Sequence, residues 1–312
     1  MTISQLEYLI AVHTYGSFVV AAEHCFVTQP TLSMQIQKLE ESLGVKLLDR
    51  SKQPVIATEV GKEVIAIARN IIQQTSTIKD IIADKKGEVA GVLKLGIIPT
   101  LAPYLLPLFV NHFCGLYPKV KLIINELTTD EIIKSLKNET IDCGLLVTPL
   151  EEKLLKETIL FYEPFVTYLS PENPLLAKKN IEASDLNVAN VWVLKEGHCF
   201  RNQVLNICSH VNYSVQNRQV EYASGSLQTL MQMVELGEGL TILPELAIWS
   251  VSENQMDRVR YFSDPQPVRE VSLVTHRDYY KKNIIDALVL SIKENIPAKM
   301  KSESKRNVVS IH

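Results

Sequence analysis

The sequence predicts two structural parts, a smaller all-α part at the N-terminus and a larger α/β part that follows it. Within residues 1–88, apolar residues recur at the three- and four-residue spacing of amphipathic helices. From about residue 89, short apolar strands alternate with helical segments, a pattern typical of parallel sheets covered by helices. The two patterns meet at a polar run, residues 84–88, which we interpret as a hinge.

Composition places the chain among ordinary globular proteins. Its 312 residues suffice for two or more domains, and 46% of them are hydrophobic and 21% charged. No apolar run reaches membrane-spanning length and the start of the chain does not resemble a signal peptide, so we expect a cytoplasmic protein without membrane contact. Five cysteines, an odd count, do not resemble a secreted disulfide framework. The net charge of −3 does not decide whether nucleic acid is bound.

Two helices joined by a tight connection are predicted near the N-terminus. Ser17 is a suitable N-cap for a helix over 18–25, and Thr28 for a second helix over about 29–42. Gly44 would end the second helix, since glycine readily adopts the left-handed conformation found after helices. This arrangement is a helix-turn-helix.

The second helix and the segment after it carry side chains suited to DNA. Short strands over 45–50 and 54–57 flank a polar turn and form a predicted wing. A recognition helix reads base edges with its N-terminal residues, and phosphate contacts fix its position. The alternative is an ordinary solvated helix face. The candidate DNA-binding residues are Gln29, Pro30, Thr31, Ser33, Gln35 (which could pair bidentately with adenine), Arg50 and Lys52.

A long helix capped by Thr58 is predicted to follow the wing. Its apolar residues have the 4-3-4-3-4 spacing of a heptad seam, which suits pairing with a second copy of the chain. Ordinary core packing would give the same spacing, but no core is expected between the two parts. The predicted dimer seam is Val64, Ala68, Ile71, Thr75, Ile78 and Ile82.

The α/β part contains a series of expected strands and helices. Strands are predicted over 92–98, 121–126, 142–147 and 271–276, and helices over 101–116, 131–137, 227–236 and 284–296. Cys25, Cys114 and Cys143 lie on apolar faces, and we expect them in the core. The residues after Pro297 are polar and basic, so we expect a flexible tail.

Two further thiols lie on one short segment, Gly197–Cys208. Its apolar spacing predicts a helix that begins near Cys199, which places that thiol at the positive helix end and Cys208 on the buried face. His198 and Arg201 flank Cys199, and a neighbouring cation favours the reactive thiolate. Nine residues of helix rise about 13 Å, whereas a disulfide needs Cα atoms roughly 4.4–6.8 Å apart. The two cysteines can therefore bond only if the segment refolds.

The same segment also admits other interpretations. The thiols could be incidental, and a phosphatase loop would need an arginine where Leu205 stands. A zinc site from His198, Cys199, Cys208 and His210 matches no common finger spacing, so we expect no metal. Elsewhere, Thr100 and Thr129 each fall where a strand gives way to a helix. They could be simple N-caps, or they could line a polar cleft at the strand ends.

The chain resembles LysR-type transcriptional regulators over nearly all of its length. The resemblance implies a winged helix-turn-helix (1–58), a linker helix and hinge that dimerise (59–88), an effector domain (89–300) and a flexible tail (301–312). The effector domain would be of periplasmic-binding-protein type, with Rossmann-like subdomains over about 89–162 with 267–300 and over about 163–266. The residues that carry the resemblance are Leu6-Glu7-Tyr8-Leu9, Gly16-Ser17-Phe18, Ala21-Ala22, Thr28-Gln29-Pro30-Thr31-Leu32-Ser33, Ile36, Leu39-Glu40, Leu43-Gly44, Leu47-Leu48-Asp49-Arg50 and Thr58-Glu59-Val60-Gly61.

Within that family the chain is most similar to members that sense hydrogen peroxide. This resemblance implies that Cys199 reacts with peroxide, that Cys208 resolves it as a disulfide, and that Thr100, Thr129, His198 and Arg269 position it. A histidine expected before the Ser-Leu-x-Thr-Leu run is replaced by Glu221. The residues that carry this similarity are Ile98-Pro99-Thr100, Pro103-Tyr104-Leu105-Leu106-Pro107, Asp142-Cys143, Gly197-His198-Cys199-Phe200-Arg201-Asn202-Gln203, Cys208 and Leu243-Pro244.

The resemblance predicts a peroxide-responsive transcriptional activator rather than an enzyme. Its partners would be operator DNA with inverted half-sites, RNA polymerase, further copies in a dimer or tetramer, and glutaredoxin or thioredoxin for resetting, without a cofactor. Two alternatives stay open at this point. One is a LysR-type regulator that binds a small metabolite in the cleft, and the other is a thiol peroxidase on a DNA-binding scaffold. The arginine Arg269 could also be a solvated strand residue.

Overall fold

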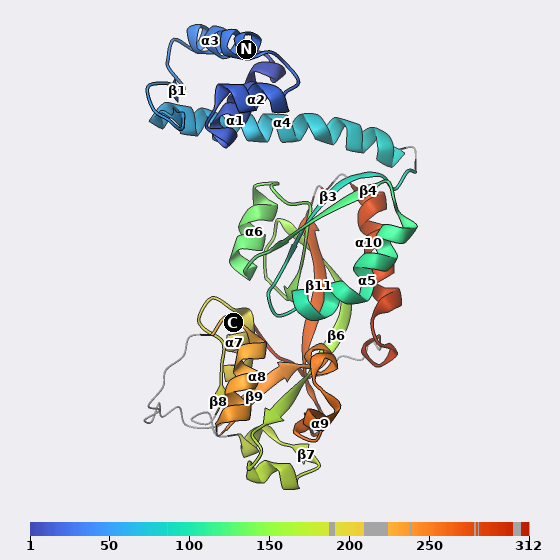
Figure 1. Cartoon of the computed structure of the whole chain (residues 1–312). Coiled ribbons are helices and arrows are strands. Elements are labelled where there is room, and N and C mark those ends of the chain that lie inside the picture. The colour runs from blue at the N-terminus through green and yellow to red at the C-terminus, as the bar shows by residue number, and fades with distance from the viewer. Residues whose placement is uncertain are drawn as a thin grey trace. The chain divides into compact units, whose positions relative to one another are not determined.

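The chain folds into two compact units, Met1–Lys86 and Gly87–His312 (Figure 1). The computed structural model describes residues 1–85, 87–186, 191–208, 224–237, 239–277, 279, 281–301 and 307–311. Over these residues no helix is both long enough and apolar enough to cross a membrane.

The first unit is the predicted winged helix-turn-helix with its long helix. It contains α1 (Ile3–Tyr15), α2 (Phe18–His24), α3 (Gln29–Leu43), the antiparallel wing strands β1 (Leu48–Asp49) and β2 (Ile56–Ala57), and α4 (Glu59–Lys85). The Ser17 hydroxyl accepts the Val20 N–H at the start of α2, and Gly44 ends α3 in the left-handed conformation with φ 70°. Thr28 precedes α3, but its hydroxyl contacts Thr31 Oγ1 at 2.8 Å instead of capping the helix.

The structure divides the expected dimer seam on α4 into two halves. Ala68 is 1% exposed inside the core of its own unit, and Val64 and Ile71 pack against that core. Ile78 and Ile82 are 60% and 51% exposed. The seam open to a second copy is therefore shorter than the heptad spacing predicts, because α1 already covers the N-terminal half of α4.

The second unit is built on one mixed sheet. Its order is β4-β3-β5-β11-β6-β10-β7, with β12 beside β11, β9 beside β6 and β8 beside β9. The elements are β3 (Gly91–Ile97), α5 (Ala102–Leu116), β4 (Val120–Glu126), α6 (Thr129–Lys137), β5 (Cys143–Thr148), β6 (Leu155–Leu169), β7 (Asn180–Ile181), β8 (Val191–Trp192), α7 (Cys199–Ile207), α8 (Leu227–Leu236), β9 (Leu240–Pro244), α9 (Glu253–Met256), β10 (Val259–Phe262), β11 (Pro267–His276), α10 (Lys282–Asn295) and β12 (Asn307–Val308).

Two long strands, β6 and β11, explain why the sheet is not parallel throughout. Strand β3 pairs in parallel with β4 and β5, as the strand–helix alternation predicts, but β11 is antiparallel to β5 and β6. Figure 1 shows these two strands joining the half that carries α5, α6 and α10 to the half that carries α7, α8 and α9. The expected subdomain boundaries, after residues 162 and 266, fall within β6 and at the start of β11.

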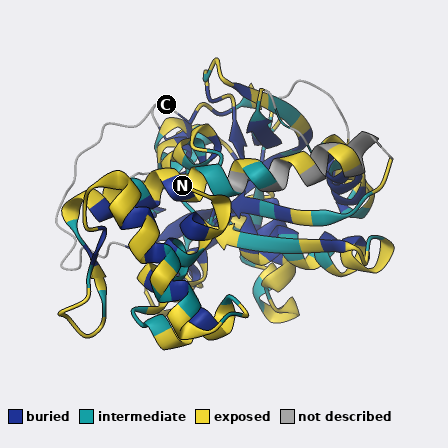
Figure 2. Cartoon of the chain, turned by 90° about the horizontal axis from the view of Figure 1, so that it is seen from above, coloured by how far each residue is buried: buried dark blue, intermediate teal, exposed yellow. Residues whose placement is uncertain are grey.

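Burial in both units follows the helix faces, and one cysteine predicted in the core is exposed instead. Figure 2 shows buried strands and helices that are buried on one face and exposed on the other. Cys143 is fully buried, and Cys25 is half-buried. Cys114 is exposed, so its predicted core position is wrong. The neighbouring Phe109 and Phe113 fill the inward face of α5, which directs Cys114 to solvent.

The C-terminal tail is also not as predicted. Asn307 and Val308 form β12, which pairs in parallel with Pro267 and Val268 of β11. Val309 is 8% exposed and belongs to the hydrophobic core of the second unit. The tail as a whole is polar, so its few apolar residues did not indicate a strand. They are ordered because the sheet offers an edge with which they can pair.

Candidate functional sites

The predicted DNA-binding residues lie at the start of α3 and along the wing. Gln29 and Pro30 are exposed in the first turn of α3, and Lys52 is exposed in the wing turn. Thr31 and Ser33 are half-buried. The helix N-terminus and the wing therefore offer polar groups to a partner, as in winged helices that bind DNA.

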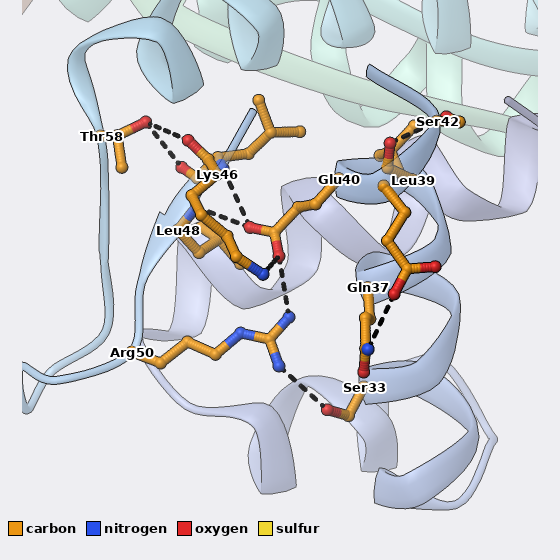
Figure 3. A network of polar contacts seen from close by, with 11 residues as sticks. Ser33, Gln37, Leu39, Glu40, Ser42, Lys46, Leu48, Arg50 and Thr58 are labelled. Carbon is orange, nitrogen blue, oxygen red and sulfur yellow. Dashed lines mark hydrogen bonds and ion pairs between the residues drawn. The ribbon is translucent and has the colours of Figure 1, made fainter. Parts of the chain in front are cut away.

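A buried carboxylate ties the wing to α3. Glu40 Oε1 accepts the backbone N–H groups of Leu47 and Leu48 at 2.9 and 3.2 Å, and Oε2 pairs with Lys46 and Arg50 at 3.2 Å (Figure 3). These bonds lower the pKa of Glu40 against the effect of its burial. Sequence reasoning missed Glu40, although its position one helical turn after the buried Ile36 could have shown that it faces inward.

Two predicted DNA contacts are already engaged within the unit. Arg50 Nη1 donates to the Ser33 hydroxyl at 3.4 Å, and its guanidinium lies 4.9 Å from the centre of the Phe18 ring. Gln35 Oε1 accepts from Gln5 Nε2 of α1 at 3.1 Å, so a bidentate contact with adenine would have to share that oxygen. The structure thus orients both side chains before any DNA is bound.

The second site is built on α7, which begins at Cys199 as predicted. His198 occupies the N-cap position, and Cys208, only 1% exposed, is the C-cap residue. Phe200, Val204 and Ile207 are buried along one face of the helix, which confirms the predicted apolar stripe. Both cysteines are free thiols at opposite ends of the helix, roughly 13 Å apart along its axis. His210 and Glu221 lie outside the described residues.

A small cavity adjoins Cys199. Its volume, measured for the centre of a water molecule, is about 10 Å³, which is room for one molecule about the size of water. Its wall consists of Ile98, Pro99, Thr100, Thr128, Thr129, Gly197, His198, Cys199 and Phe200. The fold therefore brings Thr100 and Thr129, from two other parts of the chain, to Cys199 and its sequence neighbour His198.

Apart from its approach to the Cys199 thiol, the Thr129 hydroxyl has no polar partner among the described residues. The sequence suggested that Thr129 caps α6, but the structure assigns this role to Thr128, whose hydroxyl accepts the Glu131 N–H at 3.4 Å in a capping box. Thr129 Oγ1 is buried and makes no hydrogen bond that meets standard geometry with any described residue. It is close enough to the Cys199 thiol to lower that thiol's pKa. A buried hydroxyl of this kind is an available contact for a small polar ligand.

Arg269, predicted to contact peroxide, is not part of the cavity wall, but it holds Thr100, which is. It is fully buried, and it donates from Nη1 to the Thr100 hydroxyl at 3.0 Å and from Nη2 to the Thr100 carbonyl at 3.1 Å. Thr100 is therefore not a simple helix cap, and Arg269 is not a solvated strand residue. On its other side Arg269 Nε donates to Glu163 Oε2 at 2.8 Å. Glu163, which sequence reasoning missed, also accepts the Leu246 N–H at 2.8 Å and so fixes the guanidinium.

The charge state of Cys199 is set by opposing effects. Burial is the largest effect and raises the pKa of its thiol above that of a free cysteine, and the Thr129 hydroxyl, the Arg269 guanidinium and the backbone N–H groups at the start of α7 offset only part of that rise. Arg201, the cation expected from the sequence, instead donates from Nη1 to the Leu194 carbonyl at 3.1 Å. The cation that favours the thiolate of Cys199 is therefore Arg269, which is distant in sequence.

His198 and Cys208 are both shifted toward their neutral forms. Burial, together with the positive charge of Lys195, lowers the pKa of His198, so its imidazole is uncharged near neutral pH. Burial raises the pKa of the Cys208 thiol to about 11. Cys208 can thus become a nucleophile only after it leaves its apolar surroundings.

Both units match models of one protein family. The model described as "Bacterial regulatory helix-turn-helix protein, lysR family" covers residues 3–62, and "LysR substrate binding domain" covers residues 86–297. A hydrogen peroxide-inducible genes activator from Pectobacterium carotovorum is 32% identical over 98% of this chain and 100% of its own length.

Solved structures show the same relationship. Full-length OxyR from Pseudomonas aeruginosa, with a cysteine-to-aspartate substitution, superposes with a TM-score of 0.72 at 33% identity and covers 95% of this chain and 99% of its own. A cysteine-to-serine mutant of Corynebacterium glutamicum OxyR with bound hydrogen peroxide gives 0.63 at 27% identity, covering 94% of this chain and 92% of its own. These relatives are transcriptional regulators, not enzymes. The chain therefore belongs to the LysR family of DNA-binding transcriptional regulators, and within that family it groups with the OxyR proteins.

Proposed function

We propose that this chain senses hydrogen peroxide through Cys199 and Cys208 and, when oxidised, activates the transcription of antioxidant genes. The observation that carries the proposal is the cavity beside Cys199. It has room for about one water-sized molecule, and it is lined by the Thr129 hydroxyl, whose one polar neighbour among the described residues is the Cys199 thiol. Hydrogen peroxide is a small donor and acceptor that suits such a site. The peroxide-inducible relatives and the peroxide-bound neighbour support the same choice of ligand.

The chemistry follows from the groups around the thiol. The Cys199 thiolate attacks one peroxide oxygen, the O–O bond breaks, and the departing hydroxide takes a proton to become water, leaving a sulfenic acid. The Cys208 thiolate then attacks the Cys199 sulfur, the S–S bond forms, and a second water leaves. Two thiols lose two electrons and two protons in total, and one peroxide becomes two waters. Glutaredoxin or thioredoxin would supply the two electrons for resetting.

Disulfide formation requires α7 to unwind. The two thiols are too far apart in the intact helix, and Cys208 must leave a site where it is 1% exposed. Phe200, Val204 and Ile207 lose their packing in the process, which costs several kcal/mol by analogy with truncations of core residues. The energy of the new bond offsets this loss, so the segment has two stable arrangements selected by oxidant.

The remaining partners follow from the DNA-binding unit. Two copies would pair through the exposed C-terminal half of α4, at Ile78 and Ile82, and effector domains would join the dimers into a tetramer. Such symmetry matches operator DNA with inverted half-sites. A change in the surface around α7 would alter the spacing of the DNA-binding units and their contact with RNA polymerase. Neither a cofactor nor a metal is needed for this cycle.

The size of the cavity disfavours the metabolite alternative. A metabolite needs a pocket of several hundred Å³, whereas the space beside Cys199 accommodates about one water-sized molecule. Membership of a regulator family likewise disfavours a thiol peroxidase.

A peptide map under non-reducing conditions tests the proposal. Brief treatment with stoichiometric peroxide should create a Cys199–Cys208 cross-link that dithiothreitol removes. Cys199→Ser should abolish the cross-link and the transcriptional response, while DNA binding persists. Cys114→Ser, which removes an exposed thiol on α5, is the matched control and should respond like the unmodified chain. Two thiols that stay free under peroxide, with the response intact, would refute the proposal.

A further inference from the structure

The C-terminal segment, residues 307–311, contacts α7 directly. Strand β12 is held on the edge of β11 by ladder pairing, and the Val309 N–H donates to the Val268 carbonyl at 2.9 Å. Figure 1 marks the C-terminus beside α7, in agreement with the hydrogen bonds between them. This segment comes some hundred residues after α7 in the sequence, so the contact exists only in the folded chain.

Three amide side chains of α7 make the contact. Asn202 Nδ2 donates to the Ile311 carbonyl at 3.1 Å, Gln203 Nε2 to the Val309 carbonyl at 2.9 Å, and Asn206 Nδ2 to the Ser310 carbonyl at 3.1 Å. Three successive carbonyls are thus each bound by a different side chain. Apolar anchoring accompanies these bonds, because Val309 and Ile311 are 8% and 6% exposed.

The contact depends on α7 being helical. Asn202 and Asn206 are one turn apart and so lie on the same helix face, and Gln203 is adjacent to them. An extended or looped segment would spread these amides and direct alternate side chains to opposite sides. The C-terminal segment therefore binds the helical arrangement of residues 199–207 and not the unwound arrangement that a Cys199–Cys208 bond requires.

We propose that residues 307–311 form a strap that stabilises α7 in its thiol form and thereby raises the oxidant level at which the Cys199–Cys208 disulfide forms. The proposal rests on the proposed function, since it assigns a regulatory partner to the same switch. The occupant of the amide face of α7 is the chain's own C-terminal strand. The strap undergoes no covalent change, and the thiols exchange electrons only with peroxide and with the resetting thiols.

The decisive variant is Asn202→Ala combined with Asn206→Ala. Both residues are exposed, so the substitutions leave the core intact, and alanine has a higher intrinsic helix propensity than asparagine. If only the intrinsic stability of α7 mattered, the variant would favour the thiol form. If the strap matters, the loss of two hydrogen bonds, each worth about fivefold, should outweigh the gain in helix propensity and shift the thiol–disulfide equilibrium severalfold toward the disulfide.

The equilibrium is measured by incubating the full chain in dithiothreitol buffers of graded redox potential and quantifying the Cys199–Cys208 cross-link by mass spectrometry. Truncation after Lys301 should shift it in the same direction as the double variant. Asn295→Ala removes an amide on α10 that donates to the Ser291 carbonyl, far from the strap in sequence, and should leave the equilibrium unchanged. An unchanged equilibrium in the double variant, or a shift toward the thiol form, would overturn the strap.

Amide hydrogen exchange of the reduced chain tests the strap independently of whether the disulfide forms. In the double variant, backbone amides of α7 and of residues 307–311 should both exchange severalfold faster than in the unmodified chain. This readout needs no peroxide chemistry, so it tests the strap even if the unmodified chain forms no cross-link, which would count against the proposed function alone. Unaltered exchange of α7 would refute the strap whatever the result of the redox titration.

Discussion

We predict that loss of one partner of the Glu163–Arg269 ion pair lowers the free energy of unfolding of the second unit more than most single substitutions do. Both side chains are 0% exposed, and Glu163 Oε2 lies 2.7 Å from Arg269 Nη2. Glu163→Ala would leave the guanidinium buried without a counter-charge and the Leu246 N–H without an acceptor. Breaking a buried pair by removing one partner costs about 3–5 kcal/mol. For a domain of this size, that lowers Tm by roughly 6–20 °C.

Tryptophan fluorescence is a specific assay for this effect, because both tryptophans of the chain, Trp192 and Trp249, lie in the second unit. The matched control is Glu152→Ala, which breaks a partly exposed pair with Lys137 at 2.9 Å and should cost no more than about 1 kcal/mol. Replacing Glu163 by leucine together with Arg269 by methionine should recover most of the loss, since no buried charge remains. Equal losses for the two alanine variants would refute the reasoning.

Three further predictions concern backbone strain, acid stability and the pKa of His198. Gly16→Ala should lower the free energy of unfolding of the first unit in urea, because φ is +62° and a Cβ would lie 2.7 Å from Pro54 Cβ. Gly44→Ala, at φ +70° in open space, should cost only about 1–2 kcal/mol, and equal losses for the two variants would contradict this. The pKa of Glu40 in the folded unit lies below 4.5, so its contribution to stability is present above pH 4.5 and is lost as the pH falls through the folded pKa. Glu40→Gln should weaken this pH dependence when unfolding is followed by circular dichroism of the helices, and identical acid-unfolding curves for the two chains would contradict it. Lys195→Met should raise the pKa of His198 in an NMR titration, because a neighbouring positive charge is removed, and an unchanged pKa would mean that burial acts alone.

Helix limits in the first unit were predictable because their signals are local. Ser17 caps α2 with its hydroxyl, and Gly44 ends α3 with a left-handed φ. The same holds for α7, whose apolar stripe and N-terminal Cys199 follow from spacing alone. Such features depend on residues within one or two turns of each other, so the sequence displays them directly.

Surface composition was a weaker guide. The last residues of the chain are mostly polar, which indicates a flexible tail when they are considered alone. Val309 and Ile311 nevertheless find buried positions, because β11 offers an edge and α7 offers three amides. The prediction that Cys114 is buried was wrong for a related reason. An apolar helix has two faces, and the sequence does not show which one packs on the sheet.

By itself, the sequence determined the winged helix-turn-helix, the long helix after it, the α/β character of the second unit and the helix that separates Cys199 from Cys208. The family resemblance named Thr129 and Arg269 for the site, but only the tertiary structure showed how they act on Cys199. Arg269 replaces the expected Arg201 as its cation, and Glu163 holds that arginine from a strand more than a hundred residues earlier. The physical reason is that a buried charge is stable only where the fold supplies its partner, and that partner comes from another strand of the sheet rather than from the neighbouring sequence.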